Sequence, residues 1–200
     1  MSGAFTAYYD GTQGRPPRRT LLEALNRFEA PGSAVDLGCG DGRDTVELLR
    51  RGWRVLAIDR EAEAIARLRA RVSAPLLETR VGRFEREDWP RGDLVNASFA
   101  LPLCPPEEFP KLWRKIEASL NPGGRFAGQL YGERDGWAGR PGLTHLTREA
   151  VEKLLSNWKI ELFEEEESDT TTPRGCTWYV LARIMRPGST NKRKNVRFSG

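Results

Sequence analysis

Two hydrophobic periodicities alternate along the chain, and each change between them marks a predicted element. Short apolar runs of about four to eight residues are typical of buried strands, and apolar residues repeating every three or four positions indicate helices. The predicted strands are 34–37, 54–59, 76–83, 93–98, 125–132, 158–163 and 176–185. The predicted helices are 18–28, 43–51, 61–72, 107–120 and 148–157. This alternation predicts an α/β fold with helices on both faces of a mostly parallel sheet.

The last two predicted strands are joined by a short link, which predicts an antiparallel hairpin. The final strand is apolar on both faces, so we expect it inside the sheet and not at its edge. The acidic run 164–167 is most simply the solvated end of this hairpin, and Asn121-Pro-Gly-Gly124 predicts a turn before the fifth strand.

A glycine-rich turn follows the first strand. Gly38, Gly40 and Gly42 lie between the apolar run 34–37 and a helical pattern that starts at Arg43. A strand, a glycine turn and a helix N-terminus together form the unit that holds nucleotide-like ligands at the carboxyl edge of a parallel sheet. The spacing differs from the Gly-x-Gly-x-x-Gly of pyrophosphate binders, and acids at the helix start would repel a phosphate. The turn therefore favours an adenosine ligand without phosphates.

An acidic residue ends the second strand. Asp59 lies 23 residues after Asp36, close to the spacing of the acid that binds ribose hydroxyls in nucleotide-binding βαβ units. One carboxylate can accept hydrogen bonds from both hydroxyls of a ribose. The alternative is an N-cap for the next helix, because Asp is a preferred capping residue. Combined with the glycine turn, the ribose role is the stronger interpretation.

With Asp36 before the first glycine, this stretch resembles motif I of the class I S-adenosylmethionine-dependent methyltransferases. Leu-Asn-Pro-Gly-Gly-Arg before the fifth strand (120–125) is a second recurring feature of these enzymes. The resemblance covers residues 5–185 and is greatest to small bacterial enzymes of the tellurite-resistance-like or related small-molecule type. It implies a doubly wound, Rossmann-like sheet of seven strands in the order 3-2-1-4-5-7-6, with the C-terminal hairpin. It also implies S-adenosylmethionine as cofactor, S-adenosylhomocysteine as product and no metal.

The resemblance further implies which residues bind the cofactor. The methionine end would lie against Asp36, the ribose against the end of the second strand, and the adenine after the third. The implied cofactor-binding residues are Tyr9, Asp36, Gly38, Cys39, Gly40, Asp59, Arg60, Arg83, Phe84, Asn96 and Phe99. Alternatives stay open for three of them: Asn96 as a hydrogen-bonded amide at the sheet rim, Phe99 as ordinary core, and Tyr9 as part of a plug instead of a lid formed by residues 1–30.

The loop 133–146 is the candidate acceptor site, because it leaves the carboxyl end of the fifth strand, where ligands bind in open α/β sheets. A base is needed only for an acceptor that is protonated at neutral pH, and the weak catalytic candidates are His145, Tyr9 and Arg134. His145 is the single histidine and equally fits a surface or capping role. Arg134 and Arg140 suit an anionic small-molecule acceptor such as a carboxylate or metalloid oxyanion, or else form surface salt bridges.

Charge and composition limit which classes of molecule the chain is expected to bind. The net charge is +4, but residues 186–200 hold five basic residues and no acid, so residues 1–185 carry 27 basic and 28 acidic residues. We therefore expect one domain over 1–185 and a disordered basic tail, with nucleic acid as a partner only through that tail. The three cysteines are far apart and are predicted to be reduced thiols in a cytoplasmic protein. No apolar run reaches membrane-spanning length, and a monomer and a dimer are both compatible.

The predicted function is methyl transfer from S-adenosylmethionine to a small-molecule acceptor. One alternative is a methyltransferase-like protein that binds the cofactor or a partner without transfer, and another is an RNA methyltransferase that uses the basic tail. Asn96-Ala-Ser-Phe99 lacks the prolines of the Asn-Pro-Pro-Tyr motif of nucleic-acid amino methyltransferases, which counts against that chemistry. A nicotinamide oxidoreductase is a further alternative, but the Gly-x-Gly-x-x-Gly spacing of such enzymes would need the third glycine one position after Gly42.

Overall fold

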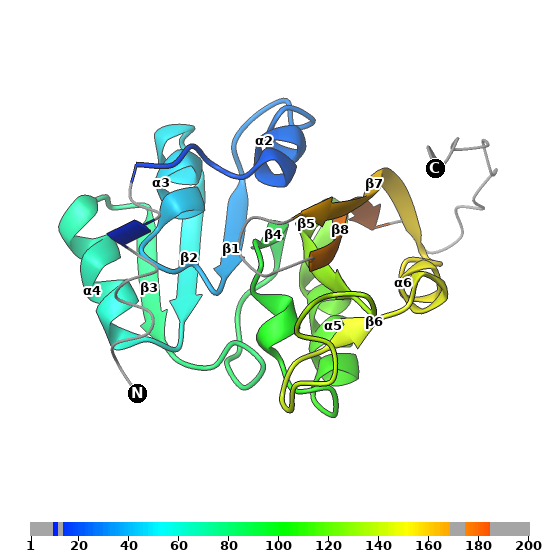
Figure 1. Ribbon diagram of the computed structural model, residues 1–200. Coiled ribbons are helices and arrows are strands. Elements are labelled where there is room, and N and C mark those ends of the chain that lie inside the picture. Colours follow the sequence, from blue (N-terminus) through cyan, green and yellow to red (C-terminus); the bar gives the residue numbers. More distant parts are fainter. Residues whose placement is uncertain (1–9, 12–13, 169–174, 185–200) are drawn as a thin grey trace.

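The computed structural model describes residues 10–11, 14–168 and 175–184. They form one sheet with helices on both faces (Figure 1). The strands are β1 Ser33–Leu37, β2 Arg54–Asp59, β3 Leu77–Val81, β4 Gly92–Ala97, β5 Leu120–Gly132, β6 His145–Leu146, β7 Trp158–Ser168 and β8 Gly175–Ile184. The helices are α2 Arg19–Leu25, α3 Arg43–Arg50, α4 Ala62–Arg71, the 3-10 turn η1 Leu101–Leu103, α5 Phe109–Ser119 and α6 Arg148–Leu154. Within this described part, no helix combines the length and the apolar character needed to cross a membrane.

The sheet has the strand order β3-β2-β1-β4-β5-β8-β7, and β6 pairs with β5 beside this path. Strands β1 to β5 are parallel, whereas β8 runs antiparallel between β5 and β7. The predicted seven-strand order and the inserted last strand are confirmed, since β7 and β8 are the sixth and seventh predicted strands. The short β6 is an addition that the sequence did not predict.

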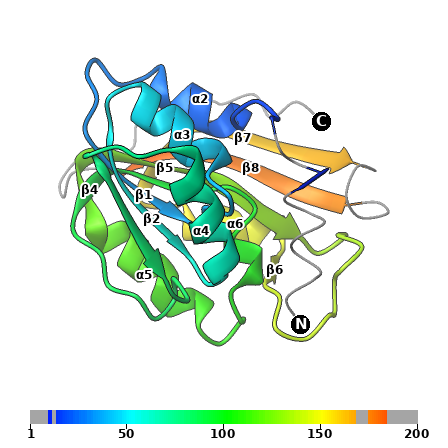
Figure 2. The same ribbon diagram turned by 90° about the vertical axis from the view of Figure 1, so that its left-hand side faces the viewer.

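Two apolar layers sandwich the sheet because successive strand residues point to opposite faces. In β1, Ala34 packs with the core that includes Leu21 of α2 and Leu48 of α3. Its neighbour Val35 packs with the core that includes Trp113 of α5. Figure 2 shows α2, α3 and α4 on one side of the sheet and α5 on the other. The strands are thus covered on both faces, as their near-continuous apolar runs predict.

Two predicted boundaries were wrong. The expected turn 121–124 lies inside β5, which starts directly after α5 and shifts its register against β4 between Gly92 and Leu94. Gly123, with φ of 84°, lets the strand pass this irregularity. The acidic run 164–167 is part of β7 and not the hairpin end, because β7 continues to Ser168 as an edge strand with exposed glutamates.

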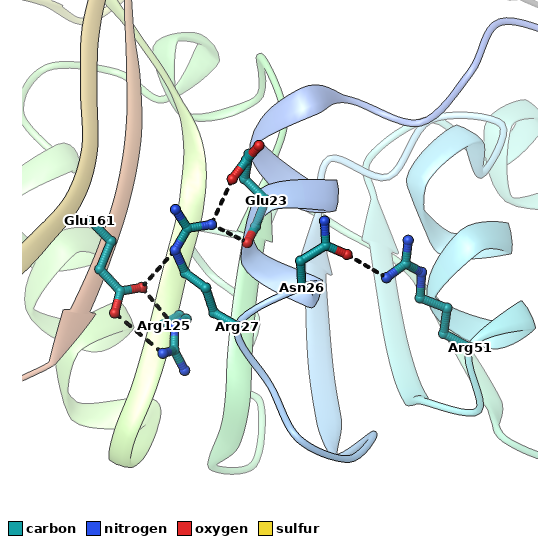
Figure 3. A network of polar contacts seen from close by, with 6 residues as sticks. All are labelled: Glu23, Asn26, Arg27, Arg51, Arg125 and Glu161. Carbon is teal, nitrogen blue, oxygen red and sulfur yellow. Dashed lines mark hydrogen bonds and ion pairs between the residues drawn. The ribbon is translucent and has the colours of Figure 1, made fainter.

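Polar contacts hold α2 over the amino-terminal half of β5 (Figure 3). Glu161 of β7 accepts two hydrogen bonds from Arg125 of β5, with Nε–Oε2 at 2.7 Å and Nη2–Oε1 at 3.2 Å. Arg27, just after α2, lies 3.8 Å from the same carboxylate and 2.7 Å from Glu23. Asn26 accepts a bond of 3.1 Å from Arg51 after α3. This network joins the end of α2 to β5 and β7 on one side and to the end of α3 on the other.

Candidate functional site

The glycine turn lies at the carboxyl ends of β1 and β2. Gly38, Gly40 and Gly42 have φ values of 65°, 56° and 91°, a region that favours residues without a Cβ. The backbone N–H groups of Gly38 and Cys39 donate to the carbonyl of Ile58 at 2.8 and 3.1 Å. The turn is therefore fixed to the end of β2, next to Asp59.

Asp59 bonds to the turn itself. Its Oδ2 accepts from the Gly40 N–H at 2.8 Å, and its Oδ1 accepts from the Glu61 N–H at 2.9 Å. The second bond joins Asp59 to Glu61, which is the N-cap of α4, so Asp59 is not itself the N-cap of that helix. Burial raises the pKa of the Asp59 carboxyl, and the two N–H groups partly oppose this shift.

Asp36 lies beneath the turn and is 2% exposed. Its Oδ2 accepts from the hydroxyl of Thr45 at 2.6 Å, and its Oδ1 accepts from the amide Nδ2 of Asn96 at 2.9 Å. Burial, followed by the nearby charge of Asp44, raises the pKa of Asp36 to about 7. The two hydrogen bonds act in the opposite direction and are too weak to offset burial.

Asp44, in the first turn of α3, is the second buried acid of this cluster. It accepts from the Ser98 hydroxyl at 2.5 Å, from Asn96 at 3.2 Å and from the backbone N–H of Arg18 at 2.9 Å. Asn96 therefore links two carboxylates at the sheet rim. Its own Oδ1 is buried and has no hydrogen-bond partner among the described residues.

The segment that follows β4, residues 98–100, is called here the exit of β4, and its backbone is unusual. Phe99 is the one non-glycine residue with positive φ, at 56°, among the residues that the structure describes. Its N–H donates to Oε1 of the fully buried Gln129 at 3.0 Å, and Gln129 donates in turn to Thr20 at 2.6 Å. The guanidinium of Arg18 lies 4.4 Å from the centre of the Phe99 ring. Backbone strain of this kind is concentrated at functional sites.

The same exit packs directly on the glycine turn. A Cβ added at Gly38 would lie 2.4 Å from the Cβ of Ala100 and 3.7 Å from the ring of Phe84. Phe84 itself is 8% exposed and belongs to the core. Gly38 is therefore required by close packing as well as by its φ.

The remaining cofactor candidates lie at the surface or in the turn. Arg83 pairs with Glu85, whose side chain is buried, through an Nε–Oε1 bond of 2.6 Å. Arg60 lies 3.2 Å from Glu61. Cys39 is a free buried thiol whose pKa is raised by burial, which favours a structural role. Tyr9, residues 1–9 and the tail 186–200 lie outside the described residues.

The loop 133–146 brings together some of its candidates and separates others. His145 begins β6, and its Nε2 lies 3.5 Å from Oδ1 of the buried Asp135. Arg134 forms an ion pair with Glu165 of β7. Arg140 lies over the ring of Trp137, 5.3 Å from its centre. Thr147 caps α6, as its position before the helix predicts, by accepting from the Ala150 N–H at 3.1 Å.

Several polar residues of this region were missed from the sequence: the buried Thr20, Thr45 and Gln129, and the half-buried Ser98. Only Gln129 carries a signal, since it interrupts the apolar run of β5 with an amide that needs partners. The others are small hydroxyl residues that are equally common at surfaces.

Comparisons with known proteins agree with this geometry. Residues 34–124 match the family model described as a methyltransferase domain. A search of curated proteins finds no match to the chain.

Several solved structures share the fold. TehB from Haemophilus influenzae is 16% identical, with a TM-score of 0.73 over 90% of this chain and 67% of that chain. The 1,6-didemethyltoxoflavin-N1-methyltransferase from Burkholderia thailandensis is 22% identical, with a TM-score of 0.72 over 90% and 85%. The N-methyltransferase NodS from Bradyrhizobium japonicum WM9 is 16% identical, with a TM-score of 0.70 over 92% and 89%. The matched domain supports the predicted resemblance to the class I S-adenosylmethionine-dependent methyltransferases, and the solved structures show that the chain shares the fold of such enzymes.

Proposed function

We propose that this protein transfers a methyl group from S-adenosylmethionine to a small-molecule acceptor. One observation supports the cofactor assignment above the others: buried carboxylates line the glycine turn, among them Asp36, Asp44 and Asp59. Such a site would repel a phosphate and would stabilise a cation. S-adenosylmethionine carries a sulfonium and an ammonium group and no phosphate.

The residues at the turn fit this cofactor. Each oxygen of Asp59 accepts one N–H, and a carboxylate has about four acceptor positions, so acceptor capacity remains for ribose hydroxyls. The unpartnered Oδ1 of Asn96 suits a donor such as an ammonium N–H. Asp36 and the backbone of residues 38–40 would hold the methionine end. Phe84, Phe99, Arg60 and Arg83 remain proposed contacts of the adenosine end.

When bound, the cofactor supplies a methyl group already activated by its positive sulfur. The chain therefore has mainly to align the acceptor and to exclude water. The exit of β4 fits this task, because Ala100 contacts the glycine turn while Phe99 faces Arg18 and Tyr179. The cofactor would lie on the Ala100 side of this segment and the acceptor on the Phe99 side.

The segment before α2 is proposed to cover the site as a lid. Its described part crosses α3 and α4: Asp10 lies 2.7 Å from Arg67, and the carbonyl of Pro16 accepts from Arg43 at 2.6 Å. The N–H of Arg18 then bonds to Asp44 in the acid cluster. Tyr9 directly precedes this segment in the sequence, so it remains a proposed cofactor contact and catalytic candidate.

The names of the structural relatives support a small acceptor. The Burkholderia thailandensis structure contains 1,6-didemethyltoxoflavin and S-adenosylhomocysteine, and NodS is described as an N-methyltransferase in complex with S-adenosylhomocysteine. An anionic acceptor depends mainly on Arg140, which is exposed beside Trp137, because Arg134 is paired with Glu165.

The ribose assignment is tested by Asp59→Ala. We expect calorimetric affinity for S-adenosylhomocysteine to fall about 10- to 100-fold, because charge-assisted hydrogen bonds of about 1.5–3 kcal/mol are lost. Glu152→Ala, an exposed i,i+4 partner of Arg148 in α6, is the matched control and should bind normally. Unchanged affinity of a folded Asp59→Ala variant would defeat the assignment.

Turnover separates the proposed function from its alternatives. A protein that binds S-adenosylhomocysteine but methylates no small molecule or RNA would support the binding-only alternative. An RNA methyltransferase would lose activity after truncation at Met185 and would bind RNA less tightly as salt rises.

A further inference from the structure

The loop 133–146 lies at the edge of the sheet where the proposed cofactor site is. Figure 1 shows β6 and this loop at the lower edge, toward which the arrowheads of β1 and β2 point. Thr144 anchors the loop there: its N–H donates to the carbonyl of Pro102 at 2.9 Å, and its hydroxyl donates to that of Cys104 at 2.7 Å. Both carbonyls follow the exit of β4, which contacts the glycine turn through Ala100.

This loop buries the carboxylate of Asp135, and few groups around it offset the cost of burying its charge. The Asp135 side chain is 2% exposed, and its Oδ1 accepts from the backbone N–H of Trp137 at 2.8 Å. Across the described ranges, no arginine or lysine forms an ion pair with it, and His145 is the one basic residue within ion-pair distance. A buried carboxylate without a positive partner is strongly disfavoured. The buried Asp135 carboxylate therefore lies next to the imidazole of His145.

The position of His145 next to Asp135 is fixed by burial and by strand pairing. Its side chain is 11% exposed, and its Nε2 is buried without a hydrogen bond at 3.5 Å from Asp135. Pairing of β6 with Tyr131 and Gly132 of β5 fixes the backbone of the histidine. A carboxylate on one ring nitrogen orients the imidazole and stabilises it after the other nitrogen takes up a proton.

Aromatic rings flank this pair. Tyr131 and Trp137 are half-buried and lie edge to face with centres 6.0 Å apart, and the Tyr131 ring is 5.8 Å from that of His145. Rings of this kind stack against flat ligands. The loop thus combines a proton acceptor with a surface for a planar molecule.

We propose that His145 removes a proton from a hydroxyl or ring N–H of a planar acceptor, and that Asp135 is the positioning residue for its imidazole. This proposal rests on the proposed methyl transfer. The acceptor proton passes to the imidazole nitrogen that faces away from Asp135. The electron pair left on the acceptor oxygen or nitrogen forms the bond to the methyl carbon, and the carbon–sulfur bond breaks with its electrons on sulfur.

The role of Asp135 is tested by nuclear magnetic resonance of protein labelled with ¹⁵N in the imidazole, where the single histidine gives one pair of ring signals. In the wild type we expect the neutral ring to carry its proton on Nε2, toward Asp135. Asp135→Asn should populate both tautomers, and Glu133→Gln, an exposed change in the same loop, should leave the wild-type spectrum. Identical tautomers in Asp135→Asn and the wild type would overturn the positioning role.

The chemistry is tested with methyl-labelled S-adenosylmethionine and three probe sets: phenols, aromatic N-heterocycles with a ring N–H, and thiophenolate. Phenols or N-heterocycles should be methylated, and His145→Gln should slow this about 100- to 10,000-fold. Thiophenolate has no proton to remove, so its methylation by His145→Gln should stay within about twofold. The proposal is overturned if His145→Gln slows the methylation of thiophenolate as much as that of the probes that carry a proton. It is also overturned if the wild type methylates thiophenolate alone.

Binding of S-adenosylhomocysteine separates this proposal from the proposed function. His145→Gln and Asp135→Asn should bind it with wild-type affinity, which also shows that both variants are folded. If the wild type itself does not bind it, the proposed function fails. If the wild type binds it and no planar probe is methylated, only the proposal for His145 and the planar acceptor fails.

Discussion

At the scale of single residues, the glycine turn packs on buried acids, and the charge of one of them, Asp36, depends on pH. Asp36 is enclosed by Thr45 and Asn96, with Asp44 and Asp59 as neighbouring carboxylates. Burial, followed by the nearby charge of Asp44, raises the pKa of Asp36 to about 7. The cluster thus combines a preference for cations with a sensitivity to protons.

This arrangement predicts a pH-dependent stability that Asp36→Asn removes. Between the unfolded carboxyl pKa of about 3.9 and the native value, the native state holds a proton that the unfolded state has released. The free energy of unfolding therefore falls as pH rises through this window. Between pH 5 and 8 the wild type should lose about 2–3 kcal/mol more than Asp36→Asn in urea unfolding.

The asparagine keeps a carbonyl for the Asn96 amide and an amide for the Thr45 hydroxyl, so the variant should fold. Glu47 and Asp93 do not contribute in this window, because the pKa of Glu47 is lowered to about 2 and that of Asp93 is also lowered. The pKa of Asp59 is raised by burial, but Asp59 is present in both proteins, so its contribution cancels in the comparison. The same pH dependence in both proteins would show that Asp36 is ionised in the native state throughout.

At the scale of elements, α2 is held to the sheet by one carboxylate that serves three arginines. Glu161 is 11% exposed and lies within 4 Å of Arg27, Arg125 and Arg183. Its bidentate bond to Arg125 is the strongest geometry in this network (Figure 3). The end of α2 therefore depends on a β7 residue 134 positions away from Arg27.

Removal of this charge predicts a loss of stability. Glu161→Gln should lower the free energy of unfolding by about 1–3 kcal/mol, because three partly buried guanidinium groups lose their common anion. Glu164→Gln is the matched control, since its ion pair with Arg19 is about half exposed and should contribute less than about 1 kcal/mol. If urea unfolding showed the same small change for both, the network would be a surface contact only.

At the scale of the whole molecule, the sheet order brings together residues that are far apart in the chain. Asp36 and Asn96 are 60 positions apart, and Thr20 and Gln129 are 109 apart, yet each pair shares a buried hydrogen bond. Ligand binding at the glycine turn should therefore stabilise the fold as a unit, since it contacts several strands at once.

We expect S-adenosylhomocysteine to raise the melting temperature and NADH to leave it unchanged. At about 100 times the dissociation constant, the stabilisation is about 2.7 kcal/mol. NADH carries a pyrophosphate, which the buried carboxylates at the turn would repel. A shift with NADH of similar size, measured by scanning fluorimetry, would contradict the phosphate-free assignment.

The sequence alone determined the fold class and the place of the glycine turn, because these depend on local periodicity and on glycine and proline positions. The strand order followed from the resemblance to a known family. The bounds of β2 were predicted to the residue, and the inserted β8 followed from its two apolar faces. Prediction from local sequence failed in two places. Residues 121–124 pair as part of β5 although their composition is typical of a turn, and the loop after β5 forms the short strand β6.

Only the tertiary structure decided how the site is assembled. The sequence marked Asp36, Asn96 and His145 as separate candidates, but not the link from Asn96 to Asp36 and Asp44, nor the pairing of His145 with Asp135. It also did not show the left-handed backbone of Phe99. The physical reason is that burial and hydrogen-bond geometry depend on the packing of several strands and loops, whereas periodicity reports only on neighbours along the chain.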